Sequence, residues 1–217
     1  MNNKINIRLY YHPKEKRRTC TLEKLVDSTQ ENNNDNCCYI SYNNYYNYCG
    51  TIYYSECYNF VYTDNDAIGC CHLFPSNKLL GYHKYDCEKI IILYDYNKYI
   101  NNIFEVKYVY FAQHSSKQGQ WKKWEECNYD NIMDKPTLNI YVALGSHASY
   151  PKPKTTFRVF CFGNDNCSYN DKYSILINNY YKALDIETPI RMNKIIKQVP
   201  EKEMTLLQKL LIPLTLL

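Results

Sequence analysis

The sequence lacks several features that would assign it to a familiar class. No apolar run approaches the roughly 20 residues that a membrane-spanning helix requires. The cysteine pairs at 37–38 and 70–71 lack the C-x-x-C spacing typical of zinc sites, and the total of 11 is odd, which argues against a disulfide framework. The opening MNNKINIRLYY contains no apolar signal segment. We therefore expect an intracellular, cytoplasmic protein with buried or unused thiols and no transmembrane segment.

Clustered positive charge is also missing. The formal net charge of +4 is spread along the chain, and Glu15 interrupts the only dense basic run, at 14–18. Nucleic-acid-binding surfaces usually gather Lys and Arg on one face, so we do not expect a nucleic-acid partner. No pattern in the chain indicates its oligomeric state.

The chain does contain a series of short segments with strand character. Its 217 residues carry no Pro/Gly/Ser-rich linker, which predicts one domain over 1–217. The 25 tyrosines favour strands over helices. We predict a mainly β fold, an antiparallel β-sandwich with a few short peripheral helices. The strand-like segments are 5–11, 51–62, 89–96, 106–113, 138–144, 156–162 and 173–177.

Two further segments differ in pattern from these strands. Residues 30–48 are rich in Asn and Tyr and have no hydrophobic period, which predicts a surface loop and is typical of a protein from an AT-rich genome. Residues 178–217 are predicted to form a helical C-terminal extension. Short helices are expected at 21–28, 178–184 and 191–197.

The densest group of chemically active side chains lies in GYHKYDCEKIIIL. His83, Asp86 and Glu88 lead into a strand, and the two-residue period of a strand places both carboxylates on one face. Because two neighbouring carboxylates repel, a divalent cation such as Ca²⁺, Mg²⁺ or Mn²⁺ would relieve the repulsion. The alternative is an exposed strand face, or ion pairs with Lys84 or Lys89.

Two more histidines follow strand-like segments. His114 ends VKYVYFAQH, and His147 lies in LNIYVALGSH, so neighbouring strands could bring both to the edge that holds His83. The candidate metal ligands are therefore His83, Asp86, Glu88, His114 and His147. The alternative is that these histidines are ordinary core or capping residues. The adjacent Ser115 and Ser146 lack a G-x-S-x-G elbow, so we do not interpret them as nucleophiles.

Broad stretches of the chain resemble a known family. The pieces HPKEK, GYHKYDCE, FAQHSSKQGQWKKW, PTLNIYVALGSHASYPKP and FRVFCFGNDNCSYN are similar, in order and spacing, to the family of the vacuolar-protein-sorting-associated protein 62, over about 7–177. Lys14 and Cys87 depart from its usual acidic residue and Trp. The candidate metal ligands, together with Asn164 and Asp165, match positions of that family. The resemblance implies a shared fold more than a shared activity.

A second, more distant similarity concerns the same residues. The chain resembles the necrosis- and ethylene-inducing toxin β-sandwiches, whose G-H-R-H-D-W-E heptad matches His83, Asp86 and Glu88, with Tyr85 in place of the second His. That resemblance implies a divalent-cation site used in recognising membrane glycolipids. The absence of a signal segment argues against a secreted toxin.

These observations lead to hypotheses from different classes. The first is a non-catalytic binding domain in which the cation supports a pocket for a glycan or a lipid headgroup. Its candidate ligand contacts are Asn164, Asp165, Trp121 and Tyr150, where Trp121 either stacks on a sugar or is buried. The second is a metal-dependent hydrolase, in which His114 or His147 transfers protons to and from a metal-bound water. The third is a purely structural accessory protein. No catalytic residue is assigned, and we expect a binding domain rather than an enzyme.

Overall fold

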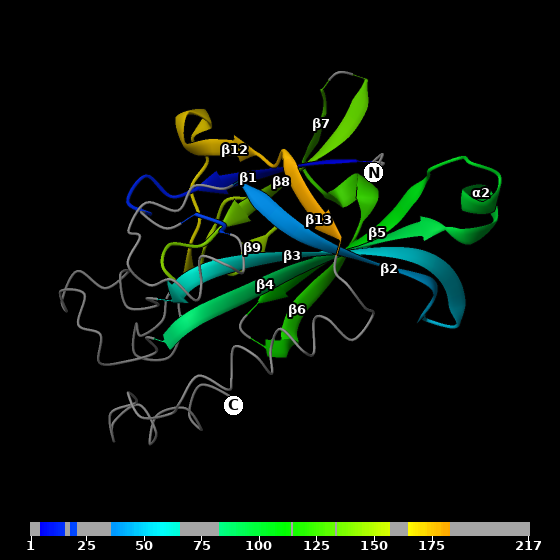
Figure 1. Cartoon of the computed structure of the whole chain (residues 1–217), viewed down its shortest axis with the longest axis horizontal. Coiled ribbons are helices and arrows are strands. Elements are labelled where there is room, and N and C mark those ends of the chain that lie inside the picture. Colours follow the sequence, from blue (N-terminus) through cyan, green and yellow to red (C-terminus); the bar gives the residue numbers. More distant parts are fainter. Residues whose placement is uncertain are drawn as a thin grey trace.

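This computed structural model describes residues 5–15, 18–20, 36–65, 83–113, 115–132, 134–156 and 165–182. Two β-sheets make up most of this part of the chain (Figure 1). The smaller sheet has the order β12-β1-β8-β7, with β9 paired to β8. Its strands are β1 (Asn6–Tyr11), β7 (Tyr129–Ile132), β8 (Lys135–Val142), β9 (Ser149–Tyr150) and β12 (Ser174–Leu176).

The larger sheet has the order β13-β2-β3-β4-β5-β6. Its strands are β2 (Cys37–Tyr48), β3 (Thr51–Asn65), β4 (His83–Asp95), β5 (Val106–Gln113), β6 (Ser115–Lys123) and β13 (Asn179–Lys182). A separate pair joins β10 (Thr155–Thr156) to β11 (Asp165–Asn166). The helical elements are short: α2 (Tyr96–Ile100), η1 (Trp124–Glu126) and η3 (Asp171–Tyr173). In the described part of the chain, none of the helices has the length and apolarity needed to cross a membrane.

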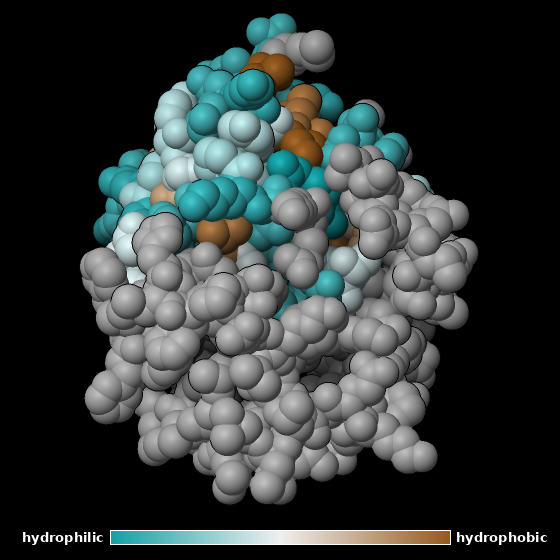
Figure 2. All heavy atoms as spheres, turned by 90° about the vertical axis from the view of Figure 1, so that its left-hand side faces the viewer, coloured by the Kyte–Doolittle hydropathy of each residue, from teal (hydrophilic) through white to brown (hydrophobic). Residues whose placement is uncertain are grey.

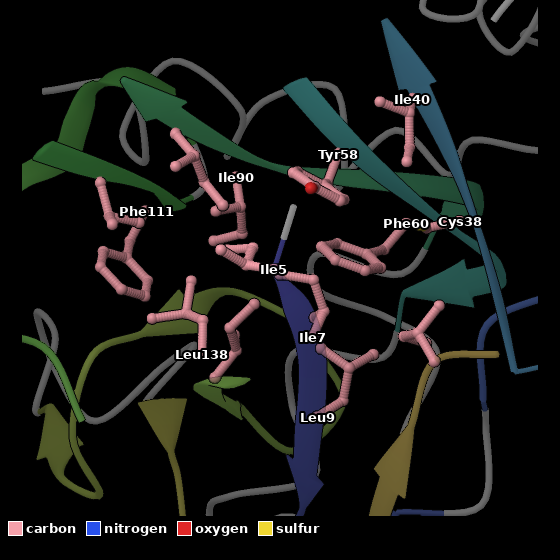
Figure 3. Packing of buried hydrophobic residues seen from close by; sticks show 14 of the residues in the cluster. Ile5, Ile7, Leu9, Cys38, Ile40, Tyr58, Phe60, Ile90, Phe111 and Leu138 are labelled. Atoms are coloured by element: carbon pink, nitrogen blue, oxygen red, sulfur yellow. The ribbon is translucent and has the colours of Figure 1, made fainter. Parts of the chain in front are cut away.

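The core forms where the two sheets face each other (Figure 3). Alternation along β3 and β4 sends every second side chain inward, so Phe60 and Ile90 are fully buried. From the other sheet, Ile7, Leu9 and Leu138 pack into the same cluster. Removing each such side chain from water stabilises the fold by about 1.5–3 kcal/mol, so the sandwich is held together mainly by this layer.

The prediction of a mainly β sandwich with few, short helices is confirmed. Most strand pairs are antiparallel, as expected, but β1 is parallel to β8 and β13 is parallel to β2. Parallel neighbours require a long connection, and the sequence spacing does not reveal which distant strands will meet. In the smaller sheet, β1 therefore lies between β8 and β12 rather than at an edge.

Two local predictions are corrected by the fold, and three others concern residues outside the described part of the chain. The surface loop predicted for 30–48 is wrong for Cys37–Tyr48, which form β2 along β3. The helix predicted for 178–184 is wrong for Asn179–Lys182, which form β13. Tyrosines line both segments and favour a strand once a partner is present. The predicted helices at 21–28 and 191–197, and residues 157–162 of a predicted strand, lie outside the described residues.

The surface and the thiols follow ordinary patterns. On the face shown in Figure 2, the described residues are mostly hydrophilic, and hydrophobic ones appear in small separate groups. The eight cysteines of the described residues are all free thiols, and five of them are buried. Burial of this kind matches the prediction of structural or unused thiols.

Candidate functional site

The first strand of interest, β4, carries two acids into the interior. Asp86 and Glu88 are 8% and 6% exposed, and both lie on the face that continues into the apolar core at Ile90. In β3 they are paired with Tyr62 and Phe60, respectively. The prediction that the two carboxylates share one face is confirmed, and the alternative of an exposed strand face is wrong for them.

A tight turn between β8 and β9 brings a histidine to these acids. The turn is closed by backbone hydrogen bonds from Ala143 N to Ala148 O, 3.0 Å, and from His147 N to Ala143 O, 3.1 Å. Gly145 and His147 both adopt positive φ, +74° and +55°, a conformation that glycine tolerates and other residues rarely adopt. This backbone places His147 inside the protein, where its exposed fraction is zero.

Three side chains fix the position of the imidazole of His147. Its Nδ1 lies 3.0 Å from Oδ2 of Asp86, within hydrogen-bond distance. Its Nε2 lies 3.7 Å from Oε2 of Glu15, which is too long for a hydrogen bond. The ring stacks on Tyr62, with centroids 3.9 Å apart and planes inclined by 2°. The imidazole is therefore held in one orientation, between two carboxylates.

Glu15 joins the loop after β1 to the histidine turn. The loop begins with a turn in which Glu15 N donates to His12 O at 2.8 Å. The Glu15 side chain is buried, and its Oε2 accepts a 2.6 Å hydrogen bond from Gly145 N. Sequence reasoning missed this residue, because it treated Glu15 only as an interruption of a basic run. A single acid among basic residues directly after a buried strand was the available signal.

Asp165, at the start of β11, is the fourth buried acid of this region. It is fully buried and accepts a 2.6 Å hydrogen bond from Ser146 Oγ, and a second one from the hydroxyl of Tyr150. Ser146 therefore hydrogen-bonds to Asp165 although it is next to His147 in sequence. This contact agrees with our interpretation that Ser146 is not a nucleophile.

Asn65, at the end of β3, ties the acids to the turn. Its Nδ2 donates to Asp86 Oδ2 and to Ser146 O, both at 3.2 Å. Its Oδ1 and the Nε2 of His147 are buried polar atoms without a hydrogen-bond partner. Sequence reasoning missed Asn65 as well, because a polar residue that ends a strand looks like ordinary turn chemistry. We call Glu15, Asn65, Asp86, Glu88, His147 and Asp165 the acid–imidazole centre.

Burial and neighbouring charges shift the proton affinities of this centre. Burial, reinforced by the carboxylates of Asp86 and Asp165, raises the pKa of Glu88 well above its usual value, and Lys89 opposes this only partly. Burial alone would lower the pKa of His147, but the hydrogen bond to Asp86 and the proximity of Glu15 outweigh it and raise that pKa. Both shifts favour proton uptake by a centre that has more carboxyl groups than imidazoles.

The remaining predicted site residues divide into two groups. Tyr150 belongs beside the centre, through its hydroxyl contact with Asp165. Trp121 lies elsewhere, half-buried in an aromatic cluster with Tyr46, Tyr48 and Tyr110, so it is neither fully buried nor isolated on the surface.

Part of the predicted ligand set falls where no side chain is described. The backbone of His83 begins β4 opposite Asn65, but its side chain lies outside the described residues, as do His114 and Asn164. Among the described side chains, no three His, Cys, Asp or Glu groups converge as a ready-made metal site. The five-ligand metal site therefore stays a prediction.

Comparison of the chain with protein-family models, with curated proteins and with solved structures finds no match. The resemblance to the vacuolar-protein-sorting-associated protein 62 family and the toxin sandwiches therefore stays a prediction.

Proposed function

We propose that this chain is a non-catalytic β-sandwich binding domain whose acid–imidazole centre takes up a divalent cation that fixes the loop carrying a polar-ligand pocket. The observation that carries this proposal is a pair of buried atoms without a hydrogen bond, Nε2 of His147 and Oδ1 of Asn65, with the Glu15 carboxylate 3.7 Å from Nε2. Buried polar atoms nearly always have a hydrogen-bond partner. Two such atoms without one, next to buried carboxylates, therefore support a bound ion at this position.

The chemistry of these donors suits a cation. Asp86 can hold the Nδ1 proton of His147, and once Nε2 is deprotonated its lone pair is available to a cation beside Glu15. A carboxylate that orients a histidine through its second nitrogen is the common arrangement behind metal-bound imidazoles. Glu15, Asn65 and Glu88 add oxygen donors, which hard cations such as Ca²⁺, Mg²⁺ and Mn²⁺ prefer. When bound, the cation would supply positive charge where the buried acids repel one another.

Burial supports a binding role over hydrolysis. His147 and Ser146 have no exposed surface, so neither can reach a substrate in this arrangement. A general base must approach the proton that it removes within hydrogen-bond distance or through one water. The buried centre can instead fix the position of the loop at 144–154, in which residues 152–154 are exposed to solvent.

Cation binding is tested by metal analysis of the purified protein and by unfolding in EDTA or in added Ca²⁺, Mg²⁺ or Mn²⁺. A cation present at a concentration about 100 times its dissociation constant raises the free energy of unfolding by about 2.7 kcal/mol. We expect Glu88→Gln to reduce this gain. Glu56→Gln is the matched control, because Glu56 is a buried acid of β3 that accepts from Tyr58 and Tyr94 and takes no part in the centre.

Two results would contradict the proposal. The first is a parent protein that purifies without an ion and shows no cation-dependent stabilisation. The second is an equal gain for the parent and for Glu88→Gln, which would locate the bound cation away from the centre.

A further inference from the structure

A small basic pocket lies beside the loop that the acid–imidazole centre holds. It has a volume of about 380 Å³, within the range of ligand-binding clefts. Its lining combines side chains of β6 and η1 with those of the loop after β9. The lining residues are Gln120, Lys122, Glu126, Pro151, Lys152 and Lys154. Three of the six lining residues are therefore lysines, against a single glutamate.

Two of the three lysines, Lys152 and Lys154, can contact an anion without first breaking an ion pair. Lys122 and Glu126 are paired, with Nζ and Oε2 3.8 Å apart. Lys152 and Lys154 are exposed, and within the described residues neither is paired with a carboxylate. The Nζ of Lys154 instead lies 4.2 Å from the centre of the Tyr150 ring, a cation–π contact that directs the side chain without neutralising it.

The loop that presents these lysines is held at both ends. Before it, Tyr150 pairs with Tyr141 of β8 and its hydroxyl donates to Asp165. After it, Cys167 N donates to Lys154 O at 2.8 Å. Pro151 and Pro153 restrict the backbone between these points. A preorganised loop loses less conformational entropy on binding, so its lysines can hold a small anion more tightly than lysines on a mobile surface.

We propose that this pocket binds a phosphate-bearing ligand, with Lys152 and Lys154 as its principal contacts and Lys122 as the third. Ammonium groups carried by two elements, β6 and the loop after β9, match an anion with several acceptor oxygens. The inference rests on the proposed function only in taking the chain to be a binding domain for a polar ligand. It does not require the cation, because none of the lining residues belongs to the acid–imidazole centre.

The test uses the full chain in EDTA and separates two sources of phosphate. Soluble pyrophosphate is titrated calorimetrically. Sedimentation then compares phosphatidylcholine vesicles with vesicles that also contain phosphatidic acid. The parent is compared with the double variant Lys152→Ala/Lys154→Ala and with the control Lys123→Ala/Lys172→Ala, which removes two exposed lysines that do not line the pocket. Circular dichroism checks that both variants are folded.

We expect the pocket variant to lose about tenfold or more in affinity per lysine, since each loses a charge-assisted hydrogen bond, and the control to bind like the parent. Glu126→Gln should strengthen binding, because it removes the one carboxylate of the lining. Binding to pyrophosphate assigns the pocket to free phosphates, and binding to phosphatidic acid vesicles alone assigns it to a lipid headgroup. If the parent binds neither probe, or if the two double variants lose affinity equally, the proposal is overturned. Cation-dependent stabilisation of the same protein, measured without EDTA, would still support the proposed cation site.

Discussion

The imidazole of His147 lies flat on the phenol ring of Tyr62, with planes inclined by only 2° and centroids 3.9 Å apart. Tyr62 comes from β3, whereas His147 lies in the turn between β8 and β9, so the contact joins the two sheets at the point where the acids are buried. Because both residues have almost no exposed surface, the stack is part of the core as well as of the centre.

Tyr62→Ala should therefore lower the free energy of unfolding by about 3–5 kcal/mol, the usual result of removing a fully buried aromatic ring. Tyr62→Phe keeps the ring and should retain most of that stability. Urea unfolding of both variants measures the difference. Equal losses for the two substitutions would mean that the hydroxyl, and not the stacked ring, contributes the stability.

The raised pKa values of Glu88 and His147 predict a pH dependence with a defined sign. Each group is protonated more readily in the folded state, so its contribution is fully present below its ordinary value, 4.5 for Glu88 and 6.5 for His147. Each contribution is lost as the pH rises through the raised value of the folded state. In EDTA, the free energy of unfolding should therefore be lower at about pH 8 than at about pH 6.

Glu88→Gln offers the check on this pH dependence, because glutamine resembles a carboxyl group that stays protonated. The variant should be more stable than the parent at about pH 8 in EDTA, and its stability should change less between the two pH values. Unfolding titrations at both pH values measure the change. A parent protein that gains stability on going to the higher pH would contradict the assignment.

The hydroxyl of Ser146 donates to buried Asp165 at 2.6 Å, so Ser146→Ala should cost about 1.5–3 kcal/mol of unfolding free energy. Tyr150→Phe removes the second hydroxyl donor of the same carboxylate. Because the two hydroxyls donate to the two oxygens of one carboxylate, the double variant should depart from the sum of the single losses. Simple additivity in a double-mutant cycle would show that the two contacts act independently.

Gly145 adopts φ +74°, and its N–H donates to Glu15, which holds the backbone of Gly145→Ala in the left-handed conformation and prevents it from relaxing. Gly50 provides the comparison, since its φ is +79° and a Cβ there would meet nothing within 4 Å. Each alanine should cost about 1–2 kcal/mol through its left-handed backbone alone, and Gly145→Ala should cost more. Thermal unfolding of the pair tests this, and equal losses would argue against a role for the hydrogen bond.

The sequence predicted the parts of this molecule that depend on local pattern. Alternation along one strand was enough to place Asp86 and Glu88 on the same face. Runs of β-branched and aromatic residues located β1, β3, β4, β5, β8 and β12, but not β6, β7, β9 or β11. Tyrosine-rich residues 37–48 were missed because their alternation is between Tyr and Asn rather than between apolar and charged residues.

Parts that depend on distant partners were not predictable from pattern. Glu15 meets Gly145 across 130 positions of sequence, and the lone acid among the basic residues of HPKEK does not indicate which distant residue it contacts. The same holds for Asn65 and Ser146, which are 81 positions apart. A strand pattern specifies faces but not which strands become neighbours, so the membership of the centre needed the fold.

The position of β1 has a consequence for how the protein is made. On one edge of β1, Asn6 pairs with Thr137 of β8, 131 positions later in the chain. The other edge of β1 pairs with β12, which follows β8 in sequence. During synthesis, the apolar side of β1 therefore leaves the ribosome long before either neighbour exists. Such long-range pairing slows folding and leaves an unpaired strand open to aggregation, so we expect newly made chains to need shielding at their first strand.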